Sequence, residues 1–228
     1  MKQSRPYDPW FGGFIEILRE RTELEGSEFG TGLSLFSLAV SIRAKRILEI
    51  GRNRGYSTFA LASALRFNEM SWDEVSFAKQ RPDMDYPTFE KPVKGTLTSI
   101  EPFAQQVAYD VIEQNGLTKY VDYVNDYSYN YTPTGEYDLI FIDGDHMYDG
   151  CLRDVQQYTP YVRPGGYFIL HDWFGWYSYG VNTSPVKKVI EEHCQDYKQV
   201  LIDTGYMSFV IFQREKPETV TEEILRFE

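Results

Sequence analysis

The chain has 228 residues, of which 42% are hydrophobic and 25% are charged, and its formal net charge at pH 7 is −11. This length and composition predict a globular protein with one full core. The negative charge argues against a nucleic-acid or anionic-membrane surface, because neutralising phosphates requires a basic patch. The sequence therefore favours a small-molecule substrate, with neither nucleic acid nor membrane as a partner.

We expect neither a secretory signal nor a membrane span. The first ten residues lack the apolar stretch of a signal, and no later apolar run is long enough to cross a bilayer. A cytoplasmic protein is therefore expected, in which Cys151 and Cys194 are reduced thiols that fill space. Aromatic residues make up 16% of the chain, so we expect some of them to line a pocket or a subunit contact of a homo-oligomer.

Apolar residues at helical spacing predict two helices before the main sheet. They are Phe14, Ile15 and Leu18 in the first helix, and Leu35, Leu38, Ala39 and Ile42 in the second. We expect residues 1–45 to form an N-terminal helical cap and residues 46–228 to form the main domain. The cap is expected either to cover a cofactor or to form a dimer contact.

A strand, a glycine turn and a helix are predicted next. Residues 47–50 form a short apolar run typical of a buried strand, and Gly51 follows directly. The helix is predicted from apolar spacing, at Thr58, Leu61, Ala62 and Leu65. Prolines and scattered charges interrupt this alternation at about residues 66–94, so we expect an insertion or lid there.

The remaining chain alternates strands with helices and ends in a hairpin. Strands are predicted at residues 96–100, 121–124, 137–142 and 167–170, a turn at 163–166, and hairpin strands at 199–202 and 208–212. The predicted helices carry Phe103, Ala104, Val107, Ala108 and Val111 on one face, then Leu152, Val155 and Tyr158, and the last begins at Ser184 and Pro185. The predicted fold class is α/β: a doubly wound, Rossmann-like sheet, mostly parallel, with a C-terminal antiparallel hairpin and helices on both faces.

The ends of the predicted strands are the candidate site, because ligands of open α/β sheets bind beyond the carboxyl ends of the strands. Each end carries an acidic residue: Glu49, Glu101, Asp126, Asp143 and Asp172. Gly51 and Gly55 are expected in the first turn because a side chain there would block the approach of a ligand to the backbone.

Two classes of nucleoside ligand fit a glycine turn followed by an acid. Glu101 can accept both ribose hydroxyls in either class. However, the turn has the spacing Gly51-x-x-x-Gly55 rather than the Gly-x-Gly-x-x-Gly that seats a pyrophosphate. Glu49 and Asp143 would repel a phosphate but attract an amino group and a sulfonium. The pattern therefore favours S-adenosylmethionine and argues against a dehydrogenase.

Four segments occur together in order: Glu49-Ile-Gly-x-x-x-Gly-Tyr-Ser-Thr58, Ile100-Glu101, Phe141-Ile-Asp-Gly-Asp-His-x-Tyr148 and Pro164-Gly-Gly. Together they resemble a class I methyltransferase, and more closely the bacterial small-molecule O-methyltransferases that include the macrocin-type sugar O-methyltransferases. The resemblance covers about residues 46–213 and implies an S-adenosylmethionine cofactor. It implies that the turn, with Gly51, Asn53, Gly55, Tyr56 and Ser57, holds the methionine part. It further implies that Glu101 holds the ribose and that Asp126, Tyr127 and Ser128 flank the adenine.

A second group of polar residues comprises Asp143, His146, His171 and Asp172. In the sugar O-methyltransferases that the chain resembles, an aspartate placed like Asp143 and two acidic residues at the next strand end hold Mg²⁺, and a histidine placed like His146 is the base. His171 departs from this pattern, because an imidazole replaces an oxygen ligand and Mg²⁺ prefers oxygen. The expected ligands are therefore Asp143, His171 and Asp172, with Mg²⁺, another divalent metal, or none.

The mechanism that the resemblance implies is O-methylation of a hydroxyl on a small metabolite or sugar. His146 would take the proton while the oxygen attacks the methyl carbon in line with the sulfonium, and Asp143 would share the catalytic site. A metal-dependent oxygenase using Asp143, His146 and His171, and a cofactor-binding subunit without catalysis, remain alternatives. The aromatic run at residues 173–179 is either a substrate wall or a loop held by its own aromatics.

Overall fold

The computed structural model describes residues 9–25, 29–69, 92–173, 184–203 and 208–216. Most of the expected insertion at residues 66–94, and the aromatic run beyond Trp173, lie outside the described residues, so both interpretations stay predictions. Residues 66–69 belong to a helix. In the described part of the chain, no helix combines the length and the apolar character needed to cross a membrane.

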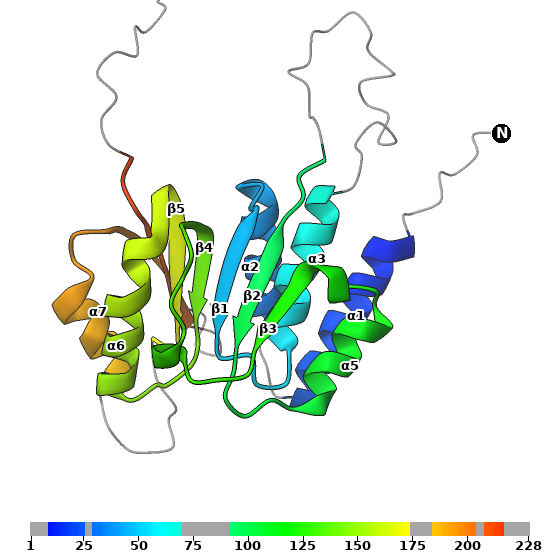
Figure 1. Cartoon of the computed structure of the whole chain (residues 1–228), viewed down its shortest axis with the longest axis horizontal. Helices are drawn as coiled ribbons and strands as arrows, with labels where there is room; N and C mark the ends of the chain where they lie inside the picture. Colours follow the sequence, from blue (N-terminus) through cyan, green and yellow to red (C-terminus); the bar gives the residue numbers. More distant parts are fainter. Residues whose placement is uncertain (1–8, 26–28, 70–91, 174–183, 204–207, 217–228) are drawn as a thin grey trace, which may run out of the picture.

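A seven-stranded sheet forms the centre of the molecule, in the order β3-β2-β1-β4-β5-β7-β6 (Figure 1). The strands are β1 (Arg46–Ile50), β2 (Thr96–Ile100), β3 (Val121–Val124), β4 (Tyr137–Ile142), β5 (Val162–His171), β6 (Lys198–Asp203) and β7 (Ser208–Gln213). Strands β1 to β5 pair in parallel, whereas β7 pairs antiparallel with both β5 and β6. The predicted fold class, including the C-terminal hairpin, is confirmed.

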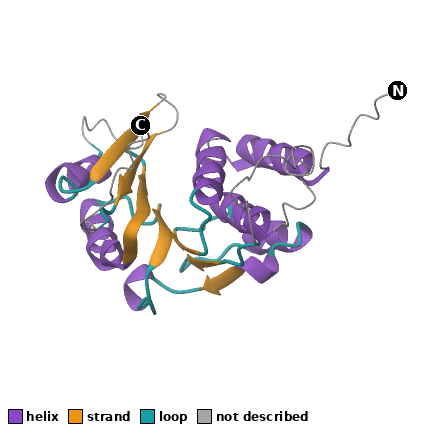
Figure 2. Cartoon of the chain, turned by 90° about the horizontal axis from the view of Figure 1, so that it is seen from above, coloured by secondary structure: helices purple, strands orange, loops and turns teal. Residues whose placement is uncertain are grey.

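Helices cover both faces of the sheet (Figure 2). On one side lie α1 (Pro9–Glu25), α2 (Phe29–Ser41), α3 (Tyr56–Glu69) and α5 (Gln106–Gln114), and on the other lie α6 (Tyr148–Tyr158) and α7 (Pro185–His193). Each side has its own cluster of buried side chains. Ile47 of β1 joins the first cluster and the adjacent Leu48 joins the second, as expected for a strand covered on both faces.

Helices α1 and α2 pack in the same core as the first face of the sheet. Phe14 of α1 and Phe36 of α2 are buried with ring centroids 4.4 Å apart, and Phe14 also stacks on Phe59 of α3 at 5.6 Å. The division into a cap at residues 1–45 and a domain at 46–228 stays a prediction.

Two predicted boundaries were wrong. Helix α5 begins only at Gln106, because the carboxylate of Glu101 accepts a hydrogen bond from the backbone N–H of Phe103 at 2.9 Å and holds this segment in a turn. Phe103 is therefore not on a buried helix face but is 71% exposed. Strand β5 begins at Val162 and runs through the predicted turn at residues 163–166, where Gly165 N–H donates to the carbonyl of Arg214.

Candidate functional site

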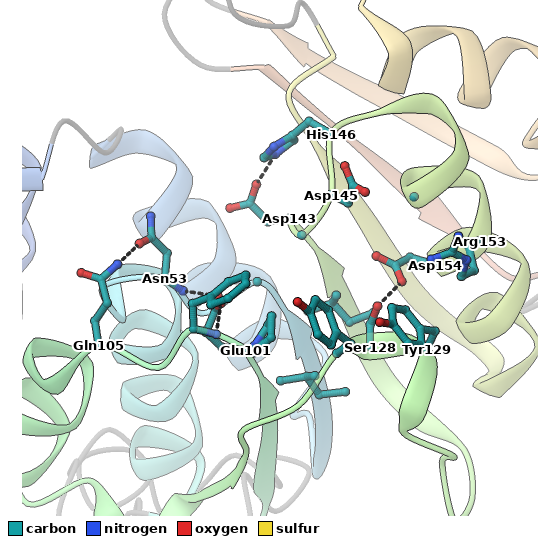
Figure 3. A pocket seen from close by; sticks show the side chains of 18 residues that line it. Asn53, Glu101, Gln105, Ser128, Tyr129, Asp143, Asp145, His146, Arg153 and Asp154 are labelled. Atoms are coloured by element: carbon teal, nitrogen blue, oxygen red, sulfur yellow. Dashed lines mark hydrogen bonds and ion pairs between the residues drawn. The ribbon is translucent and has the colours of Figure 1, made fainter.

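A cavity of about 600 Å³ opens at the carboxyl ends of the parallel strands, close to the point where strand order reverses between β1 and β4. Its wall includes Gly51 and Asn53 after β1, Glu101 after β2, Ser128 after β3 and Asp143 after β4 (Figure 3). The volume falls in the range of about 300–1,000 Å³ that is usual for small-molecule sites.

The two glycines of the first turn are required by packing. Gly51 has a φ of +91°, and a Cβ on it would lie 2.0 Å from the carbonyl oxygen of Asp143. Gly55 has a φ of +86°, and its Cβ would lie 2.9 Å from the Cα of Ala108 in α5. The turn thus closes against β4 and α5. The expectation that a side chain there would block a ligand stays a prediction. Of the two, Gly51 lines the cavity.

Glu49 lies beneath the turn, with none of its surface exposed. Its carboxylate accepts hydrogen bonds from Ser57 Oγ at 2.6 Å and Thr58 Oγ1 at 2.7 Å, and a third from Ser99 Oγ. Burial raises the pKa of Glu49, although these hydrogen bonds and nearby Arg52 act in the opposite direction.

Five predicted cofactor ligands do not line the cavity: Glu49, Gly55, Tyr56, Ser57 and Asp126. Glu49 and Ser57 are buried against each other, and Tyr56 is buried with its hydroxyl 3.0 Å from Thr22 Oγ1 of α1. Glu49, Tyr56 and Ser57 support the turn in this structure, and their predicted role in cofactor binding stays a prediction. Burial could not be read from the motif, because a strand-end acid has the same spacing whether it faces solvent or the core.

Arg52, in the middle of the turn, is a buried cation that was not expected from the sequence. It is 1% exposed, and its guanidinium donates to the carbonyl of Ser99 at 2.8 Å and to Asn125 Oδ1 at 2.7 Å. It also lies 4.9 Å from the ring centre of Tyr123. These contacts tie the turn to the ends of β2 and β3.

Glu101 faces the cavity and is held by backbone amides. Its two carboxylate oxygens accept from the N–H groups of Asn53 and Phe103, each at 2.9 Å. Asn53 has a left-handed φ of +45°, and its side-chain oxygen accepts from Gln105 Nε2 at 2.6 Å. Each carboxylate oxygen retains capacity for a further hydrogen bond, so Glu101 is oriented and able to accept from a ligand.

The segment after β3 contributes two of its three predicted residues to the cavity wall. Tyr127 and Ser128 line the cavity, and Ser128 Oγ donates to Asp154 Oδ1 of α6 at 2.6 Å. Asp126 instead stabilises the segment, because its Oδ1 accepts from the N–H of Tyr127 at 2.7 Å and from Asn130 Nδ2 at 2.8 Å.

The ends of β4 and β5 bring four titratable side chains together, as predicted. His146 Nε2 lies 3.1 Å from Asp143 Oδ1 and 3.0 Å from Asp172 Oδ2. His171 Nδ1 lies 3.2 Å from Asp143 Oδ1 and 3.2 Å from Asp172 Oδ1. We call these four residues the Asp/His cluster. Asp143 and His146 line the cavity, and His171 and Asp172 lie behind them with side chains 13% and 17% exposed.

The aspartates and histidines of the Asp/His cluster stabilise each other's charged forms. Burial alone would raise the pKa of Asp143, but the adjacent His171 and His146 hold it well below its usual range. Burial alone would lower the pKa of His146, but Asp143 and Asp172 raise it. Asp172 has a left-handed φ of +62°, a conformation rare outside glycine that aspartate tolerates better than most residues. Such backbone strain is found preferentially at functional sites.

The donor atoms of the cluster suit a divalent metal. One nitrogen or oxygen from each residue lies within 4.8 Å of all the others. Neighbouring ligands about 2.1 Å from an octahedral metal are roughly 3.0 Å apart, close to the separations found between the histidine nitrogens and the carboxylate oxygens. Two imidazoles among the donors favour a first-row transition ion over Mg²⁺, which prefers oxygen.

Comparison with known families assigns the fold. The model of a methyltransferase domain family matches residues 48–173, which is more than half of the chain and includes both the glycine turn and the Asp/His cluster. This chain belongs to that methyltransferase domain family. The prediction of a class I methyltransferase is therefore confirmed.

Solved structures of methyltransferases share the architecture. An O-methyltransferase of Bacillus cereus, in complex with SAH, is 18% identical, covers 92% of each chain and has a TM-score of 0.61. The O-methyltransferase TomG of Streptomyces achromogenes, in complex with SAM, is 18% identical, covers 94% of this chain and 92% of its own, and has a TM-score of 0.60. An SAH-bound methyltransferase of Podospora anserina is 18% identical over 95% and 92% of the two chains, with a TM-score of 0.63. At these identities the likeness shows the fold.

Among curated proteins, the match is short. An uncharacterised protein of Acanthamoeba polyphaga mimivirus is 44% identical over 36 residues. These residues are 16% of this methyltransferase and 16% of the viral protein, so the chain spans a small part of that relative.

The cavity wall also includes residues that were not expected there, among them Phe103, Asp145, Arg153 and Asp154. Asp154 had a detectable signal in the sequence. It lies three residues after Cys151 and four before Tyr158, on the apolar face of α6, where a carboxylate is out of place unless it has a role.

Proposed function

We propose that this methyltransferase transfers the methyl group of S-adenosylmethionine to a hydroxyl oxygen of a small, polyhydroxylated metabolite. The observation that carries the proposal is the position of His146, on the wall of the cavity and held by two carboxylates at 3.1 and 3.0 Å. The relatives bound to SAM or SAH support the cofactor, and their description as O-methyltransferases supports the acceptor atom.

The cavity has features that fit the two halves of the cofactor. Glu101, held by the amides of Asn53 and Phe103, would accept the ribose hydroxyls. Asp143 also lines the cavity, where a carboxylate favours the positive charge of the sulfonium and the amino group. Tyr127 and Ser128 would flank the adenine beyond the ribose.

In the reaction, the acceptor hydroxyl loses its proton as its oxygen forms a bond to the methyl carbon. The sulfur–methyl bond breaks with its electron pair going to sulfur, which leaves S-adenosylhomocysteine and a methyl ether. When His146 Nε2 donates to the carboxylates, Nδ1 is the nitrogen that accepts the proton. Asp143 and Asp172 then stabilise the resulting imidazolium, as a carboxylate does in a catalytic triad. The proton subsequently passes to solvent.

The Asp/His cluster fits a divalent metal, and the residues that would hold it are Asp143, His171 and Asp172. When bound, such an ion would lower the pKa of a hydroxyl and orient it. In the presence or absence of the ion, His146 would accept the proton and Glu101 would hold the ribose.

The test is a transfer assay with SAM carrying a labelled methyl group, on a panel of sugars, polyols and phenols, alongside calorimetric titration with SAM and SAH. We expect one cofactor site per chain and label transfer to a hydroxyl compound. Absence of both SAM and SAH binding by folded protein would contradict the proposal. Cofactor binding without transfer to any acceptor would favour a non-catalytic binding subunit.

A metal-dependent oxygenase is a second candidate, since the cluster supplies two histidines and two carboxylates. That reaction would leave the glycine turn and Glu101 without a ligand. Oxygen consumption dependent on Fe²⁺, with no binding of SAM, would favour it over methyl transfer.

A further inference from the structure

Asp154 is a carboxylate in the cavity wall to which the proposed reaction assigns no role. It belongs to α6, its residue is 2% exposed, and it lines the cavity close to Ser128 and Gly144. In the described part of the chain, its single hydrogen bond joins Oδ1 to Ser128 Oγ at 2.6 Å. The guanidinium of Arg153, its neighbour in the chain, lies over the ring of Tyr129 at 5.3 Å.

A buried carboxylate with one hydrogen bond is costly unless a further donor satisfies it. The pKa of Asp154 is consistent with this cost. Burial raises it to about 6, although the hydrogen bond from Ser128 acts in the opposite direction. Its second oxygen, Oδ2, lies 3.3 Å from the position that a Cβ on Gly144 would occupy. Glycine at 144 therefore leaves the space next to this oxygen open at the cavity wall.

Aromatic side chains surround the same part of the cavity. Phe103, Tyr127 and Tyr129 line it and remain 71%, 42% and 48% exposed. The rings of Tyr127 and Tyr129 stack with centroids 5.1 Å apart, and Phe103 meets Tyr127 edge to face at 5.9 Å. Exposed aromatic faces beside a carboxylate suit a flat ring that carries a hydrogen-bond donor on its edge.

Figure 3 shows the direction in which a bound nucleoside would extend across the cavity. Glu101 lies on the side of Asn53 and Gln105, and the Ser128–Asp154 pair lies on the opposite side of the cavity. A nucleoside anchored by its ribose on Glu101 would extend its base past Tyr127 and toward Asp154. The donor on the edge of adenine is its exocyclic amino group.

We propose that Asp154 recognises the exocyclic amino group of the cofactor's adenine, and that Ser128 holds the carboxylate in the orientation that accepts it. Asp154 is thus a specificity-determining residue for the nucleobase. This inference rests on the proposed function, because it takes S-adenosylmethionine as the cofactor. A purely structural Asp154 would tie Ser128 to α6 and would not discriminate between bases.

The experiment compares binding of SAH with binding of its counterpart in which hypoxanthine replaces adenine, by calorimetric titration. The second ligand presents a carbonyl oxygen where adenine presents the amino group. Wild-type protein should bind SAH at least about tenfold more tightly, since an unpaired acceptor facing a carbonyl costs more than about 1.4 kcal/mol, the equivalent of tenfold.

Asp154→Asn should reverse or abolish this preference. The amide oxygen can still accept from Ser128, so the NH₂ group turns to the base and matches the hypoxanthine carbonyl. Asp149→Asn is the matched control: Asp149 also lies on α6, but it is exposed and does not line the cavity. Its variant should keep the wild-type ratio.

The outcomes separate the two proposals. Failure of wild-type protein to bind SAH would reject the proposed cofactor. Binding of both ligands within threefold of each other by wild-type protein would reject the role of Asp154 and leave the proposed function intact. An unchanged preference in folded Asp154→Asn would also reject it. The wild-type comparison needs no variant, so it tests the role of Asp154 even where the substitution disturbs folding.

Discussion

The two sides of the candidate site hold their carboxylates in different ways. On the side of β1 and β2, Glu49 is bound by three hydroxyl groups and Glu101 by two backbone amides. On the side of β4 and β5, Asp143 and Asp172 contact the imidazoles of His146 and His171. Neutral donors built into the fold give the first side a fixed shape. The charge and contacts of the second side depend on protons and bound ligands, which suits the side where bonds change.

The largest effect should come from His146→Ala, which tests whether the chemistry is confined to the β4 and β5 side. The transfer rate should fall about 10³-fold, because general bases contribute roughly 10²–10⁴-fold. The dissociation constant for SAH should change by less than about twofold, because the fixed side is untouched.

His193→Ala is the matched control for that experiment. His193 lies on α7, where its Nε2 is 3.1 Å from the hydroxyl of Tyr148, and it does not line the cavity. Its variant should retain the wild-type rate. A His146 variant that also retained the rate would remove His146 as the base.

Gly51→Ala tests whether the β1 and β2 side depends on the close packing of the glycine turn. The added Cβ would lie 2.0 Å from the carbonyl oxygen of Asp143, and the φ of +91° is unfavourable for alanine. We expect the free energy of unfolding in urea to fall by about 3 kcal/mol and SAH binding to weaken, since strain and overpacking each cost roughly 1–3 kcal/mol.

Gly116→Ala separates the cost of a left-handed backbone conformation from the cost of a steric clash. Gly116 has a φ of +64°, but in the described part of the chain nothing lies within 4 Å of the position that a Cβ on it would take. Its variant should therefore lose only about 1 kcal/mol. Equal losses in the two variants would show that the contact between the turn and β4 is unimportant.

The choice of metal tests whether ligands set the state of the β4 and β5 side. After treatment with chelator, the protein should bind Mn²⁺ about tenfold more tightly than Mg²⁺, because the imidazole of His171 among the ligands favours the transition ion. His171→Asp should reduce that preference by supplying a third carboxylate. Calorimetric titration and the electron paramagnetic resonance signal of Mn²⁺ measure both; a preference for Mg²⁺ in wild-type protein would contradict the expectation.

The sequence predicted the fold well because the signals were local. Apolar runs located the strands, Gly51 and Gly55 located the turn, and Ser184 with Pro185 located the start of α7, where Ser184 Oγ accepts from the N–H of Lys187. The Asp/His cluster was also expected, since the carboxyl ends of β4 and β5 are adjacent in the sheet.

The sequence could not show which side chains turn inward. Glu49 has the spacing of a ligand-binding acid but lies beneath the turn, and Arg52 is buried although an arginine in a turn is usually exposed. Phe103 was taken for a buried helix residue, yet it faces the cavity from outside α5. These outcomes depend on contacts between segments far apart in the chain, such as Arg52 with Asn125.

A crystal structure of the protein with bound SAH is the most direct test of the division between the two sides. We expect the ribose hydroxyls on Glu101 and the sulfur facing Asp143 and His146, so that a methyl group on it would point at the space beside His146. SAH bound with its ribose away from Glu101, or with its sulfur turned from the Asp/His cluster, would contradict the account.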